Sequence, residues 1–161
     1  MDRLRASTDI FPIELTDIRQ THRILYGKDV VSDLEVQDEH LRLELERELK
    51  GKLLQLRERY LLAADRPREV KALLIQSLST FLVLCRAALR LWQPDVPAKK
   101  LDAVRALTQH IPFDLGVFER IERLKATGRL EGDPHQVFAD YLKLVETIAD
   151  AVDTRMHHRV S

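Results

Sequence analysis

The stretch from Glu69 to Trp92 constrains the fold more than any other part of the chain. Its apolar residues recur at steps of three or four residues, the spacing of one face of an α-helix: Val70, Leu74, Leu78, Phe81, Cys85, Ala88 and Trp92. Further leucines widen this apolar surface well beyond one stripe: Leu73, Leu82, Leu84, Leu89 and Leu91. A helix that is apolar on several sides needs neighbours on several sides, so the pattern predicts a central helix enclosed by others.

The composition is that of a soluble, helix-rich domain. Of its 161 residues, 45% are apolar and 32% are charged, and the 26 Lys and Arg equal the 26 Asp and Glu. Because no net positive charge attracts phosphates or anionic lipids, we expect neither nucleic acid nor a membrane as a partner. The longest uninterrupted apolar run of the central helix, residues 81–85, is also far shorter than the roughly 20 residues of a membrane span. The single Cys85 excludes an intramolecular disulfide, and we expect it to be a small buried hydrophobe of a cytoplasmic protein.

A second long helix is predicted from Asp38 to about Ala63. Its apolar residues keep a strict helical spacing: Leu41, Leu45, Leu49, Leu53, Leu56 and Tyr60. Gly51 interrupts this pattern at a cost of about 1 kcal/mol relative to Ala, so we expect a close helix crossing at that point. The short turn at residues 65–67 then forces an antiparallel hairpin with the central helix.

Three more helices are predicted after the central one. Prolines at positions 94 and 97 end the central helix, and a short helix follows over residues 98–109. Asp114 begins the next helix, which stops at Gly128. Asp133 and Pro134 then supply a cap and a first-turn proline for a helix that reaches about Met156.

These elements predict an all-α fold, an up-and-down helical bundle of about five helices over residues 37–161. Residues 1–36 are predicted to form a short extended arm, with one strand at residues 11–15. A lone strand exposes its backbone hydrogen-bonding groups, so the arm should pair with another chain or lie across the bundle. We therefore expect the protein to form a homo-oligomer.

A family resemblance appears within this arm. Residues 10–17 (IFPIELTD), followed by residues 23–27 (RILYG) and a long charged helix, resemble the closing part of a bacterial nucleotidyltransferase-fold domain of the polymerase-β type. In that superfamily a late strand of the catalytic sheet carries an acidic residue between two apolar ones, as Glu14 stands between Ile13 and Leu15 here. The resemblance implies that Glu14 is a vestigial third carboxylate and that the helices form the C-terminal region of such a protein.

The sequence lacks the motifs that carry out catalysis in that family. Neither the Gly-Ser nor the Asp-x-Asp motif of the family occurs in the chain. Phosphoryl transfer needs clustered carboxylates to hold divalent metals, so we expect Glu14 to be catalytically silent. The resemblance then implies a non-catalytic substrate-positioning or assembly domain whose partner is a missing nucleotidyltransferase domain. Magnesium and a nucleotide would be cofactors only if that catalytic half exists.

Two alternatives stay open for the function. Arg105 and His110 match the spacing of the arginine and histidine of the HEPN family of helical ribonucleases, which includes toxin–antitoxin components. Under that alternative the two side chains would have to meet in a shared cleft. A plain helical interaction module is the other alternative.

Arg86 and Arg90 are candidate binding residues. They lie four apart on a largely apolar helix, so they share one strip of its surface. A buried guanidinium needs a carboxylate or phosphate partner. The pair therefore predicts either a structural ion pair with the first or last helix, or a polar seam that faces the missing domain or its anionic substrate. No metal site is expected, because His157 and His158 are adjacent and would point about 100° apart on a helix.

Overall fold

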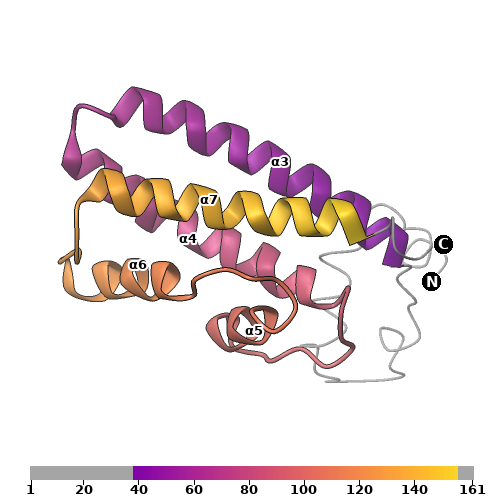
Figure 1. Ribbon diagram of the computed structural model, residues 1–161. Helices are drawn as coiled ribbons and strands as arrows, with labels where there is room; N and C mark the ends of the chain where they lie inside the picture. The colour runs from indigo at the N-terminus through magenta and orange to yellow at the C-terminus, as the bar shows by residue number, and fades with distance from the viewer. Residues whose placement is uncertain (1–37, 156–161) are drawn as a thin grey trace, which may run out of the picture.

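The structure is a computed structural model that describes residues 38–155 of the chain. This part contains five helices and no strand: α3 (Asp38–Ala63), α4 (Pro67–Leu89), α5 (Lys100–Leu107), α6 (Gly116–Thr127) and α7 (Pro134–Thr154) (Figure 1). The predicted all-α bundle is thereby confirmed. The arm predicted over residues 1–36, with its strand at residues 11–15, lies outside the described residues.

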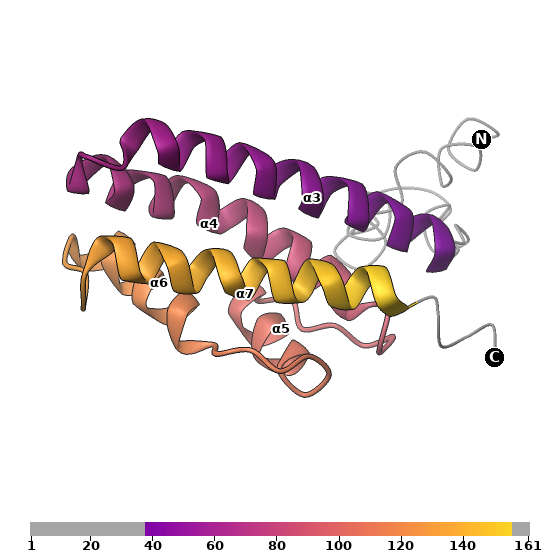
Figure 2. The same cartoon turned by 45° about the horizontal axis from the view of Figure 1, so that its top comes forward.

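The four longer helices alternate in direction along the bundle. α3 and α4 form an antiparallel hairpin, and α6 and α7 form a second one beside it (Figures 1 and 2). The short helix α5 lies across one end of α4, between the two hairpins in the chain order (Figure 1). This arrangement is the up-and-down topology that the short connections predict.

α4 is the centre of the molecule, as the apolar stretch predicts. It packs against α3, α5, α6 and α7, and most of its residues are buried. Over residues 38–155, α4 is also the one helix that is long and apolar enough to cross a membrane. The short uninterrupted run of residues 81–85 suggested otherwise, but a few isolated polar residues do not make a helix too polar to span a bilayer. However, 61% of its apolar window is buried inside the protein, as expected for the core helix of a bundle.

The helix ends follow the chemistry of their capping residues. Asp133 accepts a hydrogen bond through Oδ2 from the backbone N–H of Gln136 at 3.0 Å, and Pro134 opens α7. Gly128 ends α6 with φ of 73°, a left-handed conformation that a residue with a Cβ adopts only at a cost. These boundaries agree with the predicted ones. α5 is shorter than predicted: the regular helix covers residues 100–107, and residues 108–110 form hydrogen-bonded turns after it.

The expectation of a close helix crossing at Gly51 is wrong for the described helices of a single chain. Gly51 is exposed, and a Cβ added there would meet nothing within 4 Å. The reason is its angular position on α3: the residues that pack on α4 and α7 are the leucine stripe, and Gly51 faces away from that stripe. Its cost in helix stability is therefore not offset by packing within the described part of the chain.

Aromatic side chains join three helices at the middle of the core. The ring of Tyr141 on α7 meets Phe81 of α4 and Phe118 of α6 edge to face, with centroids 5.7 Å and 6.0 Å away. Its hydroxyl is 3.0 Å from the hydroxyl of Ser77, so the buried polar atom is paired. Tyr60 of α3 stacks on Phe138 of α7 at 4.1 Å, which closes the remaining side of the bundle.

Candidate interaction surface

α3 has a second apolar stripe, on the side opposite its core residues. Its members are the exposed large apolar residues of the described chain: Leu43, Leu54, Leu61 and Leu62, which are 46%, 57%, 77% and 74% exposed. At about 100° per residue, Leu43, Leu54 and Leu61 lie within about 20° of one another around the helix. We call the surface formed by residues 43, 47, 50, 51, 54, 57, 58, 61 and 62 the outer face of α3.

Charged residues surround these leucines in an ordered way. Lys50 forms ion pairs with Glu46 and, at 3.8 Å, with Asp153 of α7. The hydrogen bond from Lys50 is the main cause that lowers the pKa of Glu46. Arg57 pairs with Glu146 of α7. These cations along one edge of the outer face are therefore neutralised by acids of their own chain.

The centre of the outer face carries one cation and one anion that, unlike Lys50 and Arg57, form no ion pair with the described residues of their own chain. Arg47 and Glu58 are exposed and stand on either side of Gly51 and Leu54. Within residues 38–155, neither forms an ion pair, in contrast to Lys50 and Arg57. Their charges are thus available to a partner that approaches this side of α3.

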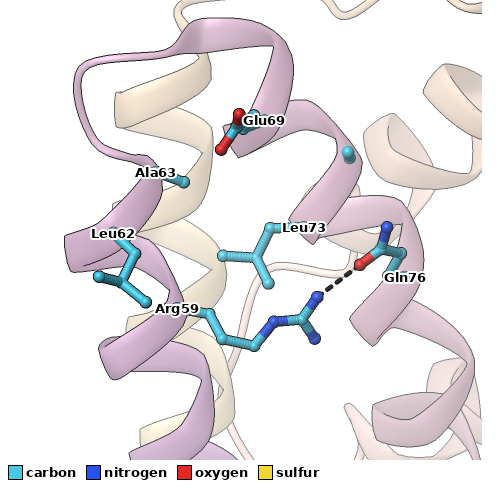
Figure 3. Close-up of a pocket in the computed structure, with 7 residues that line it drawn as sticks. Arg59, Leu62, Ala63, Glu69, Leu73 and Gln76 are labelled. Carbon is cyan, nitrogen blue, oxygen red and sulfur yellow. Dashed lines mark hydrogen bonds between the residues drawn. The ribbon is translucent and has the colours of Figure 1, made fainter.

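A hollow of about 340 Å³ continues the outer face toward α4. It lies near the turn of the hairpin and is lined by Arg59, Leu62, Ala63, Glu69, Ala72, Leu73 and Gln76 (Figure 3). Arg59 reaches across it from α3 and donates a hydrogen bond to Gln76 of α4 (Figure 3). Leu62 belongs both to this hollow and to the outer face, so the two form one surface.

Arg86 and Arg90, the predicted binding residues, lie at the end of α4 that carries α5. The side chain of Arg86 is buried, at 6% exposure, and its Nε donates a hydrogen bond to the carbonyl oxygen of Pro97 at 3.2 Å. Arg86 thereby ties the connection between α4 and α5 to the core. Arg90 is half-buried and stands at the C-terminal cap of α4. Neither residue is part of the outer face of α3.

Arg105 and His110 contact different residues. Arg105 is exposed and forms ion pairs with Asp102 at 3.3 Å and Glu119 at 3.8 Å. His110 hydrogen-bonds Gln93 through Nε2 at 3.0 Å and stacks on Trp92. The structure therefore places the cation among carboxylates and the imidazole beside an amide and an indole.

The other residues singled out in the sequence fall in two groups. Glu14, His157 and His158 lie outside the described residues. Cys85 is fully buried in α4, and burial raises the pKa of its thiol to about 12, so it is the small buried hydrophobe that was predicted. Within the described 118-residue stretch from 38 to 155, no three His, Cys, Asp or Glu side chains come together in a group that could hold a metal ion.

The outer face of α3 was not predicted from the sequence, because the regular spacing of the core stripe accounts for the helix without the second group of leucines. Leu43, Leu54 and Leu61 are separated by eleven and seven residues, so they coincide on a helical wheel, opposite the stripe that includes Leu45 and Leu49. That coincidence on the helical wheel was the signal by which the sequence could have indicated the outer face.

Comparison with known protein families, with characterised proteins and with solved structures finds no match for this chain.

Proposed function

We propose that this chain is a non-catalytic helical assembly module that binds a protein partner through the outer face of α3. The observation that carries the proposal is the second apolar stripe on a helix whose first stripe already supplies the core. Single exposed leucines are common on proteins, but four of them on one helix, three aligned on one side and one beside a hollow, indicate an interaction site. Leu54, Leu61 and Leu62, each more than half exposed, form the apolar part of that site.

The resemblance in residues 10–27 supports one class of partner for this module. A nucleotidyltransferase-fold domain, carried by a separate protein or by a longer form of this one in the bacterial cytoplasm, would be a partner of the bundle. Magnesium and a nucleotide would then bind that domain rather than this chain. We expect nucleoside triphosphates with magnesium to leave the melting temperature of this chain unchanged, and a rise in that temperature would contradict this assignment.

The test of the module is a photo-crosslinking experiment in cells that produce the full chain. A benzophenone amino acid replaces Leu54 on the outer face of α3 or, as the matched control, Lys125, an exposed residue of α6. We expect cross-linked species from position 54 and none from position 125. The proposal is wrong if position 54 gives no adduct, or if both positions give the same adducts.

A further inference from the structure

We infer that the outer face of α3 binds a second copy of this chain, in an antiparallel arrangement that places Leu54 of each copy against Gly51 of the other. The inference rests on the proposed function, since it names the partner of the same surface. Its starting point is a spacing: Arg47, Gly51, Leu54, Glu58 and Leu61 follow alternating four- and three-residue steps on one exposed side of α3. This is the seam spacing of helices that pack along their length.

A two-fold axis between residues 52 and 53 brings unlike residues of this seam together. In such an antiparallel pair, Gly51 faces Leu54 and Arg47 faces Glu58, and each contact occurs twice. A parallel pair would instead place Arg47 against Arg47 and Glu58 against Glu58. Charge complementarity therefore favours the antiparallel arrangement, because like charges across an interface are repulsive.

This arrangement explains why a glycine occupies position 51. A Cβ at Gly51 would point into open space in the single chain, so packing within the described helices does not call for glycine there. Opposite a leucine from a second copy, the missing side chain leaves room for the Leu54 side chain and lets the two backbones approach closely. The close helix crossing at Gly51 is then made between two molecules.

The edges and ends of the seam are compatible with the same packing. Lys50 would lie near Arg57 of the other copy along one edge, but each cation is already neutralised by Glu46, Asp153 or Glu146 of its own chain. At the ends, Leu62 would face Leu43, both exposed in the single chain. The contact extends over residues 43–62, roughly 30 Å of helix, so we expect a small interface and a dimer of micromolar affinity.

Sedimentation velocity of the full chain over a wide concentration range tests this inference. We expect a monomer–dimer equilibrium whose dissociation constant rises at least about tenfold in Arg47→Glu and in Glu58→Arg. The double variant, which restores opposite charges across the two-fold axis, should recover dimerisation. Gly51→Gln should also weaken the dimer while the helix content of the monomer stays intact, and Arg129→Glu, on the exposed segment after α6, should change nothing.

Three results would overturn the inference. A chain that is monomeric at every concentration shows that no second copy binds. A dimer that survives Leu54→Glu uses another surface, and a double charge variant that stays monomeric excludes the antiparallel register. Each of these leaves the proposed function separately testable, because adducts from position 54 with a different protein would support the module and exclude self-association.

Discussion

Gly51 lowers the stability of α3, although nothing around it in the single chain requires a glycine. It lies in the interior of a 26-residue helix, is exposed, and has open space where a Cβ would be. We expect Gly51→Ala to raise the free energy of unfolding of the monomer by about 1 kcal/mol, because glycine is the poorer helix former. Denaturant unfolding at low protein concentration measures this.

The control for that prediction is Gly128→Ala. Gly128 has φ of 73°, so the added Cβ should strain the end of α6 and lower the free energy of unfolding by about 1 kcal/mol. A Gly51→Ala variant that is less stable than the wild type would show that α3 is held in the monomer in a way that the described residues do not account for.

Arg86 is a second residue with a clear structural consequence. Its buried guanidinium donates to the Pro97 carbonyl, so Arg86→Met leaves that acceptor without its charged donor. We expect a loss of about 2 kcal/mol in the free energy of unfolding, measured by denaturant titration. The exposed Arg129→Met serves as the control and should change stability by less than about 0.5 kcal/mol. An unchanged stability in Arg86→Met would instead favour the predicted seam toward a partner.

Cys85 makes the stability of the fold depend on alkaline pH. Its thiol titrates near 9.0 when unfolded and near 12 when buried, so between these values the unfolded state binds fewer protons than the folded state. Stability should therefore fall as pH rises above 9.0, with a mean slope from this group of about 1 kcal/mol per pH unit between pH 9.0 and 10.0. Urea titrations between pH 9.0 and 10.0, the ordinary pKa of tyrosine, should show this slope in the wild type and a smaller one in Cys85→Ala.

At the scale of elements, the start of α7 depends on one side chain. The carboxylate of Asp133 accepts the hydrogen bond from the Gln136 backbone N–H, which has no partner in the first turn otherwise. We expect Asp133→Ala to lower the free energy of unfolding by about 1 kcal/mol. Glu131, two residues earlier, makes an exposed ion pair with Arg123, and Glu131→Ala should cost much less. Equal losses in the two variants would contradict a capping role.

α3 is the element in which the structure and the proposals meet. Its inner stripe packs on α4 and α7, and its outer stripe remains exposed along the same helix. A helix with two apolar stripes on opposite sides is typical of one that lies between two partners. Here the first partner is the rest of the bundle, and the second is the proposed second copy.

At the scale of the whole molecule, the contacts of α4 with the four other helices predict cooperative unfolding. Trp92, the single tryptophan, reports on the end of the bundle, where Arg155 stacks over its ring at 5.2 Å and also donates to the Leu91 carbonyl. We expect Trp92 fluorescence and far-ultraviolet circular dichroism to change at the same urea concentration. A fluorescence change at a lower concentration would show that the region of α5 separates before the hairpins unfold.

The sequence alone was sufficient to predict the bundle, because helix periodicity and capping residues are local signals. The spacing of Leu74, Leu78 and Phe81 predicted a core helix, and Asp133 predicted the start of α7, as the structure confirms. The environment of Arg86 was not accessible in this way. Its hydrogen bond to Pro97 joins residues eleven apart across a proline-containing connection whose path follows no periodic rule.

The sequence already indicated the core side of α3, but only the tertiary structure showed that its second stripe stays exposed and what surrounds Gly51. Both stripes of leucines are present in the sequence, but packing against α4 and α7 buries one and leaves the other exposed. The physical reason is that amphipathicity is a property of a single helix, whereas burial depends on where the other helices lie. The sequence therefore determined the helices and the central position of α4, and the packing of the helices determined which leucines of α3 remain exposed.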